Sequence, residues 1–199
     1  MADTDPREVY LKGVRLSYPH LHEKQKATDD AKPKFSATFL IDPSTKIGKM
    51  NIAKIEKAMD AACEMEFKKP RTKMRFKDDR CCFKDGNDCL TQNGDIKAGY
   101  EDMMAVSSSN PNPFTILGRN KKPVDPDNSP FYGGCIVEGI VRFYGTKNGG
   151  APGLFASMEA IRFWDDGEHF GSPPVSADAF DDDDDEGGFG DDDDDDMLG

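Results

Sequence analysis

The sequence predicts a domain dominated by β-strands, with one long helix. Three observations indicate this class: short segments in which apolar and polar residues alternate, one segment with a helical period, and glycine and proline between them. A chain of 199 residues, 36% of them hydrophobic, is long enough to enclose one sizeable core. No segment approaches the roughly 20 consecutive apolar residues of a membrane span, so we expect a cytoplasmic protein that does not enter membranes.

The first predicted strand covers residues 9–18 and changes face part-way. Its apolar residues fall on odd positions before Gly13 and on even positions after it. A change of parity at a glycine is typical of a β-bulge, because one extra residue turns every later side chain to the other face. The side chains opposite the apolar ones are then those of Tyr10, Lys12, Arg15 and Ser17.

A second strand and the helix follow. Alternation over 35–41 predicts the strand, and the sequence from Asp42 to Ser44 gives the signals of a helix start. The apolar stripe of the helix recurs with a spacing near 3.6 residues, and the helix is predicted to end before Pro70. The residues that fall near this stripe are Ile52, Ile55, Met59, Ala62, Cys63 and Glu66.

Three more strands are predicted in the second half of the chain. One covers 103–107, and the stretch 108–132 is predicted to be mostly loop around a short apolar run at 114–117. The last two strands, at 135–144 and 154–164, are predicted to form a hairpin because a glycine-rich connection joins them.

Together these elements favour an OB-type five-stranded Greek-key barrel with embellishing loops, an all-β-dominated architecture. The helix is expected after the second strand, whereas the usual OB order places it between the third and the fourth. We expect this barrel to be a nucleic-acid-binding domain at 1–170. Residues 171–199 are predicted to be a flexible linker and a disordered acidic tail, because they hold too little apolar surface to offset the entropy of ordering.

The net charge of −12 is concentrated at one end of the chain. Residues 178–199 hold 13 acids and no base, whereas the other 177 residues hold 26 bases and 25 acids. The most basic segment is 67–80, FKKPRTKMRFKDDR. Lysine and arginine bind phosphates while a ring stacks on a base, so we predict that this segment binds nucleic acid; the alternative is a solvated charged loop. The residues concerned are Lys68, Lys69, Arg71, Lys73, Arg75, Phe76, Lys77 and Arg80.

Cations and rings also share one side of several predicted strands, at a spacing of two or three residues. A sheet face that carries both kinds of side chain suits single-stranded DNA, because stacking tolerates any base. The alternative is that the rings only pack at the strand ends. The groups are Tyr10 with Lys12 and Arg15, Arg142 with Tyr144, and Arg162 with Trp164.

The acidic tail is predicted to act on the basic body. A tethered polyanion competes with DNA for a cationic groove, because a linker of about 20–25 residues spans roughly 25–30 Å and keeps the tail at about millimolar effective concentration. When DNA displaces the tail, it is free to bind partner proteins. An acidic run that only aids solubility is the alternative. The residues concerned are Asp191, Asp192, Asp193, Asp194, Asp195, Asp196, Met197 and Leu198.

Two segments resemble a known family. VYLKGVRLSYPHL near the start and GLFASMEAIRFWDDGEHFG near the end are similar to a phage-encoded family of single-stranded DNA-binding proteins, over most of 8–171. The resemblance implies a non-catalytic protein that coats and protects single strands during phage replication and recombination in the host cytoplasm. It also implies that the tail recruits replication and recombination proteins. In that family the tail typically ends in a bulky hydrophobic residue, whereas Gly199 follows Met197 and Leu198 here.

Other ligands and functions stay open at this stage. An acidic adaptor or DNA mimic would use the tail without binding DNA, and a metal-dependent nuclease would use acids of the body. Double-stranded DNA is a further candidate ligand, because phosphate contacts do not distinguish one strand from two. Self-association into a homo-oligomer is neither required nor excluded by the sequence.

No cofactor or metal is expected. Cys81, Cys82 and Cys89 lack the paired spacing of zinc ligands, and five cysteines without a secretion signal are expected to stay reduced. His20 and His22 are predicted to be polar loop residues, because they follow the proline that ends the alternation of the first strand.

Overall fold

The structure is a computed structural model that describes residues 5–148 and 150–171. Within these residues the chain forms seven β-strands, one α-helix and four short 3-10 turns. Among the described helices, none is both long and apolar enough to cross a membrane. The elements are β1 (Glu8–Gln25), β2 (Lys34–Ile41), α1 (Lys46–Phe67), η1 (Arg71–Lys73), η2 (Asp78–Arg80), β3 (Phe83–Asp85), η3 (Gly86–Asp88), β4 (Met104–Asn110), β5 (Thr115–Leu117), η4 (Pro126–Asn128), β6 (Ile136–Thr146) and β7 (Gly153–Asp165).

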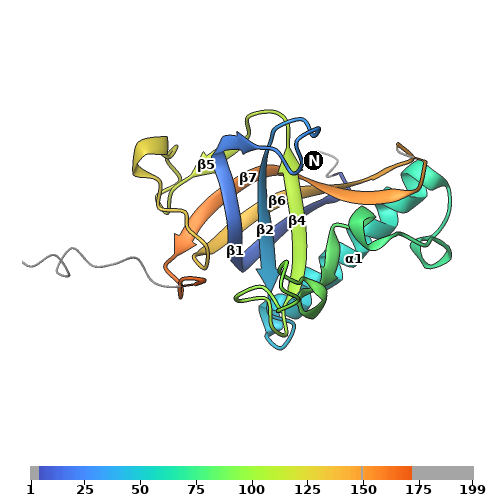
Figure 1. The fold of residues 1–199 in the computed structure, drawn as a ribbon, viewed down its shortest axis with the longest axis horizontal. Helices are drawn as coiled ribbons and strands as arrows, with labels where there is room; N and C mark the ends of the chain where they lie inside the picture. The colour runs from blue at the N-terminus through green and yellow to red at the C-terminus, as the bar shows by residue number, and fades with distance from the viewer. Residues whose placement is uncertain (1–4, 149, 172–199) are drawn as a thin grey trace, which may run out of the picture.

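Five of the strands close into a barrel. They are hydrogen-bonded in the order β4–β2–β1–β6–β7, and β7 returns to β4 through a parallel pairing between Ser108 and Ala156. The short β3 extends the sheet beyond β4, and β5 pairs with β7. This is the strand order of an OB-type Greek-key barrel, and it confirms the architecture that the sequence predicted. Figure 1 shows β1, β2 and β4 side by side in the barrel wall.

The register of β1 shifts at three points, of which the last lies between His20 and Gln25 and the first two have an unusual backbone conformation. At the first, the register against β6 shifts between Leu11 and Val14, and Gly13 has a φ of +58°, which confirms the predicted bulge. At the second, the register against β2 shifts between Ser17 and His20, and Tyr18 has a φ of +46°. A residue other than glycine seldom adopts this backbone conformation, so the second irregularity is a strained point of the strand.

β1 is longer than the sequence predicted. It continues to Gln25, so His20 and His22 lie on the strand, and the prediction that they are loop residues is wrong. Pro19 has no N–H to donate, but it falls inside the second irregularity, where it has no partner in the ladder with β2. β3 was not predicted, and β4 extends three residues past the predicted end, to Asn110.

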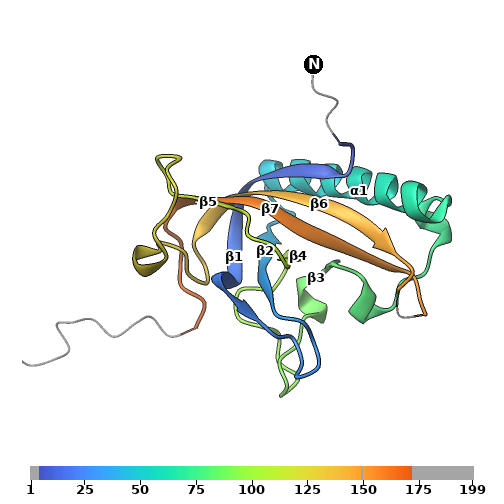
Figure 2. The same cartoon turned by 90° about the horizontal axis from the view of Figure 1, so that it is seen from above.

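α1 closes one end of the barrel. It begins after Thr45, whose Oγ1 accepts a hydrogen bond from Gly48 N at 2.9 Å. Its buried face, which includes Ile55, Met59 and Phe67, packs against the strand side chains that fill the barrel. The helix follows the second strand, as predicted, and Figure 2 shows it alongside β1 and β6.

The chain after β7 folds back onto the barrel. Tyr132 stacks on His169 with ring centroids 3.9 Å apart. Arg15 donates hydrogen bonds to main-chain carbonyl oxygens and lies over the ring of Phe170, at 4.4 Å from its centroid. These contacts fix the described chain almost to its end. The linker and disordered tail predicted at 171–199 lie, apart from the first residue, outside the described residues.

Candidate nucleic-acid interface

A continuous groove crosses the outer face of β2 and β4. It consists of three adjoining cavities with volumes of about 860, 290 and 600 Å³. The first and second cavities share Ser36 and Ser109, and the second and third share Cys81 and Lys84. We call the whole the β2–β4 groove. Its near end lies at the β1–β2 connection, and the residues that line its far end include Phe76, Phe83 and Leu90.

The near end of the groove is strongly basic. Among the described residues, four lysines and no acid line it. None of these lysines forms a salt bridge within the described chain, so their charges are available to an anionic ligand. The four are Lys26, Lys32, Lys34 and Lys97.

Tyr18 stands at the same end of the groove. Its side chain is among the most exposed large apolar groups of the described chain, at 55%. The ring lies 6.5 Å from that of the buried Tyr100, and the ammonium of Lys97 lies 5.2 Å from its centroid. Tyr100 is 2% exposed, and burial raises its pKa. An exposed ring supported in this way is a platform for a flat ligand.

The middle of the groove has a floor of small hydroxyl side chains. Ser107 and Ser109 lie on β4, next to Ser36 of β2. Phe155 of β7 also lines this part, and the guanidinium of Arg80 lies 5.6 Å from the centroid of its ring. Small side chains let a ligand approach the sheet closely, and each hydroxyl both donates and accepts hydrogen bonds.

The basic segment 67–80 reaches the groove only through its last residues. Phe76 and Lys77 line the far end, where three aspartates also lie. Arg80 flanks the middle through its contact with the β7 ring. Arg71 instead forms a salt bridge of 2.7 Å with a carboxylate of α1. The other predicted bases are exposed beyond the end of α1 and do not line the groove: Lys68, Lys69, Lys73 and Arg75.

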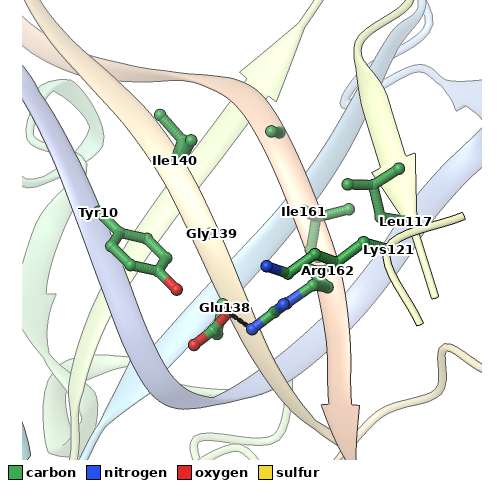
Figure 3. Close-up of a pocket in the computed structure, with 9 residues that line it drawn as sticks. Tyr10, Leu117, Lys121, Glu138, Gly139, Ile140, Ile161 and Arg162 are labelled. Carbon is green, nitrogen blue, oxygen red and sulfur yellow. Dashed lines mark ion pairs between the residues drawn. The ribbon is translucent and has the colours of Figure 1, made fainter. Parts of the chain in front are cut away.

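A second group of predicted residues lies on a different face, the outer side of β1, β6 and β7. A cavity of about 250 Å³ opens there, lined by Tyr10, Lys121 and the ion pair between Arg162 and Glu138, and we call it the β6–β7 pocket (Figure 3). Glu138 is only 8% exposed, and its pairing with Arg162 offsets part of the cost of burying a charge. The sequence-predicted residues on this face are Tyr10, Lys12, Arg142, Arg162 and Trp164.

The remaining predicted residues have partners within the protein. Arg142 pairs with a carboxylate of β7 at 3.3 Å. Tyr144 is half-buried, with its ring 6.1 Å from that of Phe155. The guanidinium of Arg15 is occupied by the contacts that hold the segment around Phe170. The structure thus divides the predicted residues between the β2–β4 groove, the β6–β7 face, internal contacts and the exposed segment after α1, instead of placing them on one surface.

The cysteines differ in exposure. Cys63, Cys82 and Cys135 are buried, and burial raises the pKa of Cys63 and of Cys135 to about 11 and raises that of Cys82 as well. Cys81 is half-buried and lines the groove. Within the described part of the chain, no three side chains of metal-binding type lie close enough together to hold an ion.

Known proteins share both the sequence pattern and the fold of this chain. A sequence family described as the ssDNA-binding protein of Enterobacter phage Enc34 matches residues 7–190. The chain belongs to this family. This match confirms the resemblance seen in the sequence, and it extends into the acidic region that begins at residue 178.

The chain is also similar to a phage protein in sequence and to two solved structures in fold. Putative protein p50 of Acyrthosiphon pisum secondary endosymbiont phage 1 is 29% identical over 189 residues, which cover 87% of this chain and 92% of that protein. The single-stranded DNA-binding protein from bacteriophage Enc34, solved in complex with ssDNA, has a TM-score of 0.65 at 21% identity and covers 83% of this chain and 90% of that one. For gp2.5, a single-stranded DNA-binding protein of bacteriophage T7, the TM-score is 0.50 at 11% identity, over 92% and 97% of the two chains. The two solved structures show that the fold is shared.

Several groove residues of this Enc34-family member were missed in the sequence. In the sequence, Tyr18 is the last alternating residue of its predicted strand. The proline that follows it is a signal of a strand irregularity. The lysines of the β1–β2 connection were missed because Asp29 and Asp30 lie among them and hide the cluster in a count of charge. Lys97 gives no local signal, because only the fold brings it to Tyr18.

Proposed function

We propose that this chain binds single-stranded DNA in the β2–β4 groove and, without acting as an enzyme, coats the strand during phage replication and recombination. The observation that carries the proposal is the near end of the groove, where four lysines and the exposed ring of Tyr18 line one cavity. Membership of the Enc34 ssDNA-binding protein family supports the class of ligand.

The lysines account for affinity. Each cation that contacts a phosphate releases a counterion from the DNA, so binding weakens as salt is added. Lys84 and Lys77 continue the row of cations into the middle and far parts of the groove. Among the described residues, aspartates line the middle and far parts of the groove but not the near end. We therefore infer that the phosphates are held most strongly at the near end.

The rings account for binding that is indifferent to most of the sequence. Tyr18, Phe155 and Phe76 line the near, middle and far parts of the groove respectively. Stacking contributes roughly 1–3 kcal/mol per base and tolerates any base, because every base has a flat face. A duplex keeps its bases stacked inside the helix, so rings in the groove favour a single strand over double-stranded DNA.

We extend the proposal to the acidic tail, whose residues lie outside the described chain. Phe170 packs against Tyr100, and Tyr100 in turn lies beside Lys97 at the near end of the groove. The tail therefore starts close to the lysines that we assign to DNA. We infer that residues 171–199 form a regulatory segment whose aspartates compete with DNA, and that replication and recombination proteins bind the tail when DNA displaces it.

Titration of labelled oligonucleotides with the full-length protein at several salt concentrations tests the proposal. We expect single strands to bind more tightly than duplex, with log affinity falling linearly against log salt by about 0.7 for each phosphate contact. A flat salt response or a preference for duplex would contradict the proposed site. The acidic-adaptor alternative predicts no binding, and shortening of the labelled strand in the presence of Mg²⁺ would indicate a nuclease.

A further inference from the structure

The β6–β7 pocket has features of a binding site that the groove does not explain. Gly139 and Ala160 contribute little side-chain volume, and Ile140 adds apolar surface. On one side, the carboxylate of Glu138 and the guanidinium of Arg162 supply polar atoms (Figure 3). We propose that this pocket binds one nucleobase of the bound strand, with preference for a base that carries an exocyclic amino group. The inference rests on the proposed binding of single-stranded DNA.

The polar atoms of the pocket match the edge of such a base. An ionised carboxylate has about four lone-pair sites. The salt bridge from Arg162 leaves part of the capacity of Glu138 unused, and Tyr10 lines the same pocket. A carboxylate accepts hydrogen bonds from the amino group of cytosine, whereas thymine offers no amino group.

The rim of the pocket matches the rest of a nucleotide. Tyr10 is 40% exposed, and its ring borders the pocket, where it offers a stacking surface. Lys121 faces the same space from the turn after β5 and has a φ of +62°, an uncommon value for lysine. Lys12 lies 5.1 Å from the centroid of the Tyr10 ring. Neither lysine forms a salt bridge with a described residue, so both are available to a phosphate.

The outer side of β7 connects the groove to the pocket. Phe155 lines the middle of the groove, and Ala160 lines the pocket. The two residues are five positions apart along the strand, which is about 17 Å. The side chains between them include the small Ser157 and Glu159, whose charge is paired with Arg142. A single strand that leaves the groove at Phe155 therefore meets no unpaired acid on this path among the described residues.

Trp164 provides a reporter, because it is the single tryptophan of the chain and its ring centroid lies 4.8 Å from the guanidinium of Arg162. We would titrate the full-length protein with labelled oligo-dC and oligo-dT of about 20 nucleotides, which exceeds the roughly 4–16 that one OB fold covers. The label reports binding to the whole protein, and tryptophan emission reports the pocket. We expect emission to change more with dC, and dC to bind about two- to tenfold more tightly than dT.

Three variants separate the pocket from the groove. Ala160→Leu fills the pocket, and Tyr10→Ser removes an exposed ring without touching the core. Both are expected to abolish the dC preference and the emission change while the label still reports binding of dT. Lys122→Ala alters the same turn outside the pocket and should behave as the wild type.

The outcomes distinguish the pocket from the proposed function. Equal affinities for dC and dT with silent tryptophan emission in the wild type would overturn the pocket alone. Retention of the dC preference in both Ala160→Leu and Tyr10→Ser would also overturn it. Absence of any signal from the label would overturn the proposed function and this inference together. A fourth variant, Tyr18→Ser, should weaken the binding of dC and of dT equally. Loss of the dC preference in this variant would place the selective site in the groove instead of the pocket.

Discussion

Asn51 of α1 makes two hydrogen bonds with the main chain of Lys12 in β1. Its Nδ2 donates to the Lys12 carbonyl oxygen at 2.8 Å, and the Lys12 N–H donates to its Oδ1 at 3.3 Å. Lys12 precedes Gly13, where the bulge interrupts the ladder with β6. The bulge leaves the main-chain N–H and carbonyl group of Lys12 without ladder partners in β6. Asn51, which is 2% exposed, supplies hydrogen-bond partners for both groups in the protein interior. The helix is thereby fixed to the barrel at the bulge.

We expect Asn51→Leu to lower the free energy of unfolding by about 1–3 kcal/mol, because two main-chain groups would lose their buried partner. Urea denaturation followed by circular dichroism measures the change. Lys54→Leu, at an exposed position of the same helix, is the control and should change stability by less than about 0.5 kcal/mol. An unchanged midpoint in Asn51→Leu would show that the pair is dispensable.

The barrel could be predicted because its strands carry local patterns. The change of parity at Gly13 and the alternation in β6 and β7 are visible in single segments, and the structure has them. The second half of β1 could not be predicted in this way. Pro19 interrupts the alternation, and pairing with the distant β2 is what continues the strand to Gln25.

The candidate site was less predictable than the fold, because charge clusters are local in sequence and grooves are not. The bases of 67–80 form a conspicuous run, yet Lys77 is the one base of that run among the described residues that line the groove. Tyr18 and Lys97 lie far apart in the chain, and they meet because β1, β2 and β4 are neighbours in the sheet.

Replacing Tyr18 tests the stacking platform. We expect Tyr18→Ser to weaken binding of single-stranded DNA by about 1–3 kcal/mol, because one stacked base loses its ring. Tyr18→Phe keeps the ring and should bind close to the wild type. Fluorescence anisotropy at fixed salt measures both variants, and equal losses in the two would indicate that the hydroxyl or the backbone, and not stacking, matters.

Removing lysines from the near end should change the salt dependence of binding. In the double variant Lys32→Ala and Lys34→Ala, we expect the slope of log affinity against log salt to become shallower by about 0.7 per lost phosphate contact. Lys54→Ala removes one exposed lysine from α1 and should leave the slope unchanged. If that control lowered the slope as much as each groove lysine does, the cations would act through overall charge instead of contact.

Neutralising the tail should tighten binding. Replacing the aspartates of 191–196 by asparagine keeps the length of the chain and removes six negative charges from it. At low salt we expect higher affinity for single-stranded DNA in this variant, and a still larger gain when 178–199 are deleted. The difference from the wild type should shrink as salt screens both competitors. Weaker binding after neutralisation would contradict competition.

Cys81 offers a test of the groove that needs no substitution. It lines the middle and far parts of the groove, whereas Cys89 lines neither. We expect bound single-stranded DNA to slow the reaction of Cys81 with a maleimide and to leave the rate at Cys89 unchanged. The buried Cys63 and Cys135 should react slowly in either state, because burial raises the pKa of each to about 11 and thiolate is the reactive form. Peptide mapping by mass spectrometry gives each rate separately, and equal slowing at Cys81 and Cys89 would place the DNA elsewhere or point to a general change in the fold.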